Sequence, residues 1–268
     1  MGKRLKLNKL GATAVAVAAV AVMFFAVSCG SPRPYSMRMV ESEMRRCPTA
    51  ADLDGMSGKL KWNYTTGLEL LSFLDAGCVL QYVDLWYDAI IREDGSVGAN
   101  YKKSNYSLDH VCPARTLFKL YDLTGKEKYR LAADTLFRAL EDQPRTPEGS
   151  FWHKEIYPNQ VWLDGLYMAL PFQAQCDAAS GKTDLADIFE QFRQVRAHHY
   201  IPETGLYLHA WDESRQMDWA DKDTGLSPCC WLRAEGWLLM AMCDCYALLS
   251  DLTPGTALLK TLLQEAVK

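Results

Sequence analysis

Residues 153–172 read HKEIYPNQVWLDGLYMALPF, a stretch in which a polar, aromatic loop runs into an apolar helix. Asp164 stands in the otherwise apolar start of this predicted helix, beside Trp162. Apolar surroundings disfavour the charged form of a carboxyl group and raise its pKa, as a general acid near neutral pH requires. A lone aspartate at such a place is more often structural, but the nearby His153 and Lys154 favour a chemical role for this one.

The rest of the chain repeats the helical pattern. Apolar residues at three-to-four spacing predict helices near 36–46, 64–75, 79–92, 108–123, 126–142, 160–179, 183–199, 229–249 and 255–267. Tight links that contain glycine alternate with longer links, whose glycines Gly95, Gly149 and Gly205 lie 54 and 56 residues apart. This period predicts an all-α fold of repeated helical hairpins, either an open solenoid or a closed α/α-barrel.

Polar and aromatic residues gather at the starts of four predicted helices. The clusters are Trp62-Asn63-Tyr64, Asp109-His110, Trp162-Leu163-Asp164 and Trp231-Leu232-Arg233. If these helices form the inner ring of a barrel, all four clusters lie at one mouth, where helix N-termini favour an anion. Taken alone, each cluster has the alternative of an ordinary N-cap or a packing aromatic residue. Because the four clusters recur at the same point of each repeat, they favour a binding site for a carboxylated sugar.

The stretch 153–172 resembles the unsaturated rhamnogalacturonyl hydrolases of glycoside hydrolase family 105 and, more distantly, the unsaturated glucuronyl hydrolases of family 88. The resemblance continues in GLYLHAWDESRQMDWADKDTGLSPCCWLRAEGWLLMAMCD, residues 205–244, which contain that family's His-x-Trp-Asp-Glu, Trp-Ala, Ser-Pro and Trp-x-Arg-x-x-Gly-Trp pattern. Residues 61–76 and 107–121 match more loosely. The resemblance therefore covers roughly residues 60–268.

The resemblance implies an (α/α)6 barrel and a substrate whose terminal uronic acid carries a C4=C5 double bond left by a polysaccharide lyase, here from rhamnogalacturonan in pectin. Asp164 takes the position of the proton donor. Asp109 takes that of a second acid, which raises the pKa of Asp164 through like-charge proximity. The positions at which the family contacts the sugar are Asn63, Tyr64, His153, Lys154, Tyr157, His209, Arg233 and Trp237.

Two further residues have both a binding and a structural interpretation. Trp211 offers a face on which a sugar ring can stack, and core packing is the alternative for it. Arg233 suits the carboxylate of the uronic acid, and an ion pair with Glu235 or another acid is the alternative. The implied reaction, protonation of C4 by Asp164 and addition of water at C5, needs no cofactor. A metal site has little support, because the chain has no Cys-x-x-Cys pair and its five histidines are scattered.

The length of the chain limits how many helices of the barrel it can form. Six hairpins at this period require roughly 330 residues after the leader, whereas Lys268 falls in the ninth of twelve expected helices. We therefore expect residues 60–268 to form an α/α-barrel domain that is incomplete at its C-terminal end. A glycan-binding lipoprotein and an inactive truncated remnant are alternatives to an enzyme, and unsaturated glucuronyl oligosaccharides are the alternative substrate.

The N-terminus predicts export. Residues 1–29 contain a basic segment, an apolar run and small residues before Cys29. The sequence AVSCG around Cys29 resembles a bacterial lipobox, so we expect a lipid anchor on this residue and a periplasmic or outer-membrane location. A plain secretory signal and an uncleaved anchor are the alternatives. Residues 30–59 are expected to form a linker and a first helix.

Charge and cysteine usage narrow the remaining function classes. The formal net charge of −4, with no long basic run beyond the leader, gives no electrostatic footprint for nucleic acid. Eight cysteines follow Cys29, most of them in apolar helical stretches, where a free thiol behaves as a small buried hydrophobe. We expect mostly free thiols.

Overall fold

The structure is a computed structural model that describes residues 33–53, 58–77, 79–182, 184–249 and 255–266. It divides into two compact units, residues 1–46 and 47–268. The described part of the first unit contains helix α2 (Tyr35–Arg46). The leader and Cys29 lie outside the described residues.

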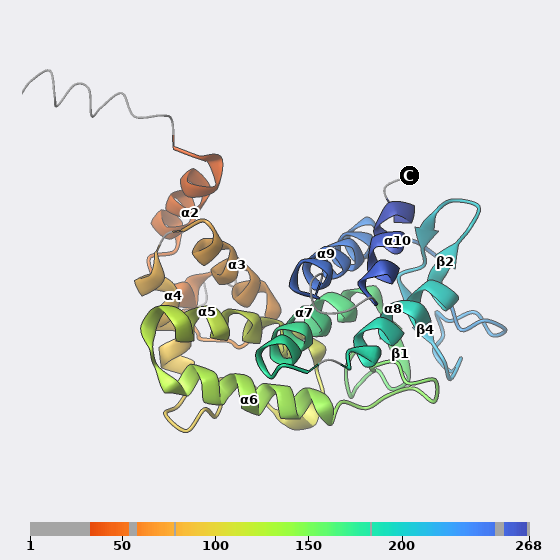
Figure 1. Cartoon of the computed structure of the whole chain (residues 1–268), viewed down its shortest axis with the longest axis horizontal. Coiled ribbons are helices and arrows are strands. Elements are labelled where there is room, and N and C mark those ends of the chain that lie inside the picture. Colours follow the sequence, from red (N-terminus) through yellow and green to blue (C-terminus); the bar gives the residue numbers. More distant parts are fainter. Residues whose placement is uncertain (1–32, 54–57, 78, 183, 250–254, 267–268) are drawn as a thin grey trace, which may run out of the picture. The chain divides into compact units, whose positions relative to one another are not determined.

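The second unit is a succession of helical hairpins (Figure 1). Its α-helices are α3 (Tyr64–Asp75), α4 (Leu80–Ile90), α5 (Arg115–Thr124), α6 (Glu127–Glu141), α7 (Leu163–Ala179), α8 (Ala186–His199), α9 (Leu232–Leu249) and α10 (Thr256–Ala266). The tight links carry the expected glycines. Gly125, for example, has a φ of 68° and ends α5 in the left-handed conformation that glycine adopts without strain. The predicted all-α fold of hairpins is confirmed.

Helix α7 is the centre of the second unit. Its residues are buried on every face, whereas α5 and α6 each have one apolar face. A helix that is apolar all round belongs in a core. Helix α7 packs along α9, which lies beside it in Figure 1, and also contacts α5, α6 and α8. Helix α7, which carries Asp164 at its N-terminal end, is therefore held in place by helices of the surrounding hairpins.

Short strands and turns replace the predicted starts of two helices. Residues 160–162, expected to be helical, form strand β1 (Gln160–Trp162), which pairs antiparallel with β4 (Ala210–Asp212). A second two-stranded ladder joins β2 (Tyr200–Ile201) to β3 (Leu206–Tyr207). A short 3-10 turn, η1 (Ala50–Asp52), precedes α3.

The segment before α5 is the second correction. Instead of one helix from residue 108, the chain makes the 3-10 turns η2 (Lys103–Asn105), η3 (Leu108–His110) and η4 (Cys112–Ala114). Pro113 explains the break, because it has no N–H to continue a helix and fits only a first turn. Gly67 of α3 lies against this proline; a Cβ there would come within 2.7 Å of the Pro113 Cα.

The described residues beyond the leader include seven cysteines, and none of the seven forms a disulfide with another described residue. Within the same residues, no helix combines the length and apolar character that crossing a bilayer needs.

Candidate active site

Asp164 is the second residue of α7, just after the extended N-cap residue Trp162. Burial raises the pKa of the Asp164 carboxyl, and the negative charge of Asp109 raises it further. A hydrogen bond from its own backbone N–H, together with the nearby side chains of Arg233 and His209, lowers the pKa in part. The net shift is upward, as a general acid requires.

Asp109 lies in η3 and faces a lysine. The Lys154 Nζ is 2.6 Å from Asp109 Oδ2, and the His153 Nε2 is 3.4 Å from Asp109 Oδ1. Burial lowers the pKa of His153 to about 4, so this imidazole is neutral near pH 7 and orients the carboxylate without a charge of its own. The Lys154 ammonium is therefore the cation that pairs with Asp109.

Three aromatic rings are stacked beside the carboxylates. The ring centroid of Trp162 is 4.7 Å from that of His153, with an interplanar angle of 8°, and 5.0 Å from that of Tyr157, with an angle of 18°. The indole Nε1 donates a hydrogen bond to Gln160 Oε1 at 3.0 Å. The stack fixes the orientation of Trp162 immediately before the start of α7.

Backbone hydrogen bonds join the loop of Asp109 to the loop of His153. The Leu108 N–H donates to the His153 carbonyl at 3.1 Å, and the His153 N–H donates to the Gln160 carbonyl at 2.9 Å. Gly165 allows this close packing, because a Cβ there would lie 3.0 Å from Leu108 Cδ1 and 3.2 Å from His153 Nδ1. The glycine after the acid is thus a packing requirement of the site.

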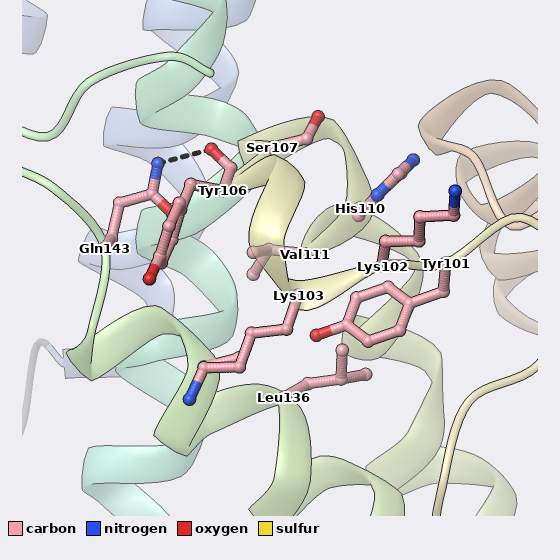
Figure 2. Close-up of a pocket in the computed structure, with 10 residues that line it drawn as sticks. Tyr101, Lys102, Lys103, Tyr106, Ser107, His110, Val111, Leu136 and Gln143 are labelled. Carbon is pink, nitrogen blue, oxygen red and sulfur yellow. Dashed lines mark hydrogen bonds between the residues drawn. The ribbon is translucent and has the colours of Figure 1, made fainter. Parts of the chain in front are cut away.

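Gln143 is a positioning residue that sequence reasoning did not identify. It follows α6, its side chain is buried, and its Nε2 donates to the carbonyls of Tyr106 and Trp152, both at 2.7 Å. Figure 2 shows the first of these bonds at the edge of a cavity of about 20 Å³ that His110 also lines. One amide therefore ties together the two loops that carry Asp109 and Lys154. A single glutamine in a loop gives no sequence signal for this role.

A further wall of the candidate site comes from the residue before β4, the segment after β4 and the start of α9. The Leu163 N–H donates to the His209 carbonyl at 3.1 Å, which places His209 next to the start of α7. The His209 ring meets Trp231 edge-on at a centroid distance of 5.9 Å, and the guanidinium of Arg233 lies 4.1 Å from the centre of the Trp231 ring.

Arg233 is available to an anion. It makes no ion pair with any residue that the structure describes, and its side chain is exposed. The proposed partner Glu235 instead accepts a hydrogen bond from the Tyr207 N–H at 2.6 Å. An Arg233–Glu235 ion pair, the structural alternative for this arginine, does not form.

Aromatic residues from the three helices α3, α7 and α9 contact one another. Trp237 of α9 lies edge-on to Tyr64 at 6.1 Å and 4.9 Å from Tyr167 of α7. The guanidinium of Arg115, which pairs with Asp244 at 2.6 Å, lies 4.9 Å from the centre of the Tyr167 ring. Tyr64 and Trp237, both predicted to contact the sugar, therefore lie together.

Asn63 acts as the N-cap of α3. Its Oδ1 accepts hydrogen bonds from the Thr66 N–H at 2.9 Å and the Thr65 hydroxyl at 3.0 Å. A cap of this kind satisfies backbone donors at the helix start. The side-chain oxygen of Asn63 is thus engaged in the helix start next to Tyr64.

Trp211 is a correction to the predicted site. Its ring is only 4% exposed, stacks on His198 at 3.8 Å, and donates from Nε1 to the Thr224 carbonyl at 3.1 Å. The register of the ladder gives the reason. Trp211 pairs with Val161, and neighbouring residues of a strand face opposite sides, so Trp211 points away from the side that Trp162 occupies.

The structure therefore brings most of the predicted residues together. Contacts join Asp109, His153, Lys154, Trp162 and Tyr157 into one group, and Trp162 reaches His209 edge-on at 6.5 Å. Among the described residues, no group of three histidine, cysteine or acidic side chains is arranged to hold a metal ion.

An acid with a raised pKa, a second acid paired with a lysine and a stack of aromatic rings, on a scaffold of helical hairpins, are suited to acid–base chemistry on a carbohydrate. The sequence model of glycosyl hydrolase family 88 matches residues 35–268. The chain belongs to this family.

Individual relatives agree with this assignment. The solved structure of a glycoside hydrolase from family 105 of C. acetobutylicum ATCC 824 has a TM-score of 0.78 and 36% identity, over 87% of this chain and 64% of that chain. The unsaturated rhamnogalacturonyl hydrolase YesR of Bacillus subtilis strain 168 is 30% identical over 158 residues, 56% of this chain and 43% of YesR. Protein Atu3128 of Agrobacterium fabrum is 41% identical over 85 residues, 31% of this chain and 36% of that protein. The chain thus spans less than half the length of these two relatives.

Proposed function

We propose that the protein is a glycoside hydrolase that removes a terminal 4,5-unsaturated uronic acid from lyase-generated rhamnogalacturonan oligosaccharides. One observation carries the proposal. Asp164 has a raised pKa because it is buried and faces the charge of Asp109, while Lys154 pairs with Asp109. The carboxyl with the raised pKa is thereby suited to donate a proton. The similarity to YesR supports the choice of substrate.

The reaction begins at the double bond of the unsaturated sugar. Asp164 gives its proton to C4, and positive charge develops at C5 and the ring oxygen. Water then adds at C5 and gives up a proton to Asp164 or to Asp109 acting as a base. The resulting hemiketal opens, and the glycosidic bond breaks in the collapse that follows. Since attack is not at the anomeric carbon, the separation of the two carboxylates does not predict retention or inversion.

Arg233 and the aromatic residues supply recognition. The Arg233 guanidinium, which pairs with no acid among the described residues, suits the planar carboxylate of a uronic acid through two parallel hydrogen bonds. Trp231 beside it is 45% exposed and can carry a sugar ring on its face. The charge of Arg233 also lowers the pKa of Asp164, so a substrate carboxylate that neutralises Arg233 strengthens the upward shift.

Product analysis with three matched oligosaccharides tests the function. The protein is incubated with an unsaturated rhamnogalacturonan disaccharide, an unsaturated glucuronyl disaccharide and the saturated form of the first, and the released sugars are identified by mass spectrometry. We expect cleavage of the first alone. Preferred cleavage of the second changes the substrate class, cleavage of the saturated sugar contradicts the hydration chemistry, and binding without cleavage favours a glycan-binding protein.

We also propose that residues 1–29 direct export and that Cys29 carries a lipid anchor in the periplasm or outer membrane of a bacterium. The support is the order of basic, apolar and small residues before this cysteine. Expression in a bacterial host fed an alkyne-labelled fatty acid tests the anchor. The wild-type protein is expected to carry the label and Cys29→Ser to lack it; equal labelling of both would contradict the proposal.

A further inference from the structure

The seven described cysteines fall into two groups by exposure. Most are buried in the helical core, and burial raises the pKa of Cys112 to about 12. Cys243 and Cys229 are exposed, and Cys230, next to Cys229 in sequence, is half-buried. The adjacent pair Cys229–Cys230 lies in the segment between β4 and α9, outside any helix or strand. A pair of neighbouring thiols at the surface is chemically distinct from the buried cysteines.

The Cys229–Cys230 pair lies against the candidate active site. Cys229 Sγ is 4.0 Å from the Nδ1 of His209. The Cys229 carbonyl accepts the backbone N–H of His209 at 3.4 Å and lies 3.3 Å from the same ring nitrogen. His209 in turn holds the start of α7, because its carbonyl accepts the Leu163 N–H. A continuous set of contacts thus runs from Cys229 to the residue before Asp164.

We propose that the Cys229–Cys230 pair is a modification site that exchanges with a low-molecular-weight disulfide and closes into a disulfide between the two neighbouring residues. The inference rests on the proposed function only for its effect on hydrolysis.

The exchange takes two steps. The exposed Cys229 sulfur, as thiolate, attacks one sulfur of the reagent RS–SR; a Cys229–SR bond forms, and RS⁻ leaves and takes up a proton. Cys230 then attacks the Cys229 sulfur, the second RSH leaves, and the Cys229–Cys230 bond forms. The pair loses two electrons and the reagent gains them. Cys229 is exposed whereas Cys230 is half-buried, so the reagent reaches the Cys229 sulfur first.

Closure of the pair must move the backbone at His209. Neighbouring Cα atoms lie about 3.8 Å apart across a trans peptide, whereas disulfides usually span about 4.4–6.8 Å between Cα atoms. Because this separation is fixed by the planar peptide, the closed pair is strained, and the backbone torsions on both sides of the Cys229–Cys230 peptide have to change to bring the two sulfurs together. The Cys229 carbonyl then leaves the His209 N–H. Since Trp231 follows directly in sequence, closure displaces both rings of this wall. We expect kcat/KM to fall about tenfold or more, mainly through KM, because the wall binds the substrate.

The test uses the full chain, freed of reductant and then treated with 2-hydroxyethyl disulfide. Mass spectrometry of the peptide that spans residues 229 and 230 distinguishes free thiols, a mixed disulfide and the closed pair. Cys230→Ser is expected to stop at the mixed disulfide on Cys229, and Cys243→Ser, which changes the other exposed thiol, to behave as wild type. Wild-type protein that stays reduced, or that retains the mixed disulfide, overturns the proposal.

Hydrolysis of the unsaturated disaccharide is measured before treatment, after it, and after reduction with dithiothreitol. A loss of kcat/KM in the wild type that dithiothreitol reverses, and that Cys230→Ser does not show because it cannot close the pair, supports the effect on His209. A closed pair with unchanged kcat/KM contradicts this effect. Reduced protein without any hydrolysis contradicts the proposed function instead. The mass spectrum then still decides whether the pair closes.

Discussion

Gln143→Ala removes an amide that helps to join the loop of Asp109 to the loop of Lys154. Each of its two hydrogen bonds is 2.7 Å long and is made by a side chain that is 5% exposed. A buried hydrogen bond contributes about 1 kcal/mol net, so the loss of both is expected to lower the free energy of unfolding by about 2 kcal/mol. For a chain of this size that corresponds to a decrease in Tm of roughly 4–8 °C. Activity is expected to fall as well, because Asp109 and Lys154 lie on the released loops.

Thermal denaturation followed by circular dichroism, together with the initial rate of hydrolysis, measures both effects. Gln194→Ala is the matched control, since this glutamine also donates to a loop carbonyl, that of Glu148 at 3.3 Å, but its side chain is half-buried and this bond is exposed to solvent. Its Tm is expected to change little, because surface substitutions usually cost less than about 0.5 kcal/mol. If Gln143→Ala matched this control in Tm and in rate, the assignment of Gln143 as a positioning residue would be refuted.

Three other predictions concern protons and packing. Burial lowers the pKa of His199 to about 4, so below about pH 6.5 the unfolded chain binds a proton that the folded chain does not bind. The free energy of unfolding is therefore expected to fall between pH 6.5 and 4, by about 2 kcal/mol at pH 5. His199→Gln is expected to flatten this part of a curve of Tm against pH. Asp109→Asn removes a charge that raises the pKa of Asp164, so the loss of kcat/KM at alkaline pH is expected to begin at lower pH, and an unshifted limb would contradict the coupling. Gly165→Ala places a Cβ 3.0 Å from a leucine carbon and is expected to lower Tm and activity, whereas Gly236→Ala, where a Cβ meets nothing within 4 Å, is expected to leave Tm unchanged or raise it.

The helices and the central aspartate could be predicted from the sequence because they depend on local pattern. The predicted ranges 64–75 and 126–142 agree closely with α3 and α6, since apolar spacing and glycine links determine where such helices begin and end. The burial of Asp164 follows from the apolar residues around it in the same helix.

Features that depend on distant contacts could not be predicted. Residues 160–162 form a strand only because 210–212 pair with them, and that register turns Trp211 away from the site. Apolar spacing around residue 108 resembles a helix start, but Pro113 divides the segment into 3-10 turns. The role of Gln143 arises from two carbonyls, 37 and 9 residues away.

The central claim is that Asp164 is the acid that protonates C4. Its most direct test compares wild type with Asp164→Asn, which keeps the shape of the side chain but cannot donate the proton as an acid. The decrease in ultraviolet absorbance of the conjugated double bond is recorded with an unsaturated rhamnogalacturonan disaccharide at equal protein concentrations. The account predicts steady loss of absorbance with wild type and a rate at least about a hundredfold lower with Asp164→Asn. A variant that consumes the double bond at the wild-type rate would contradict it.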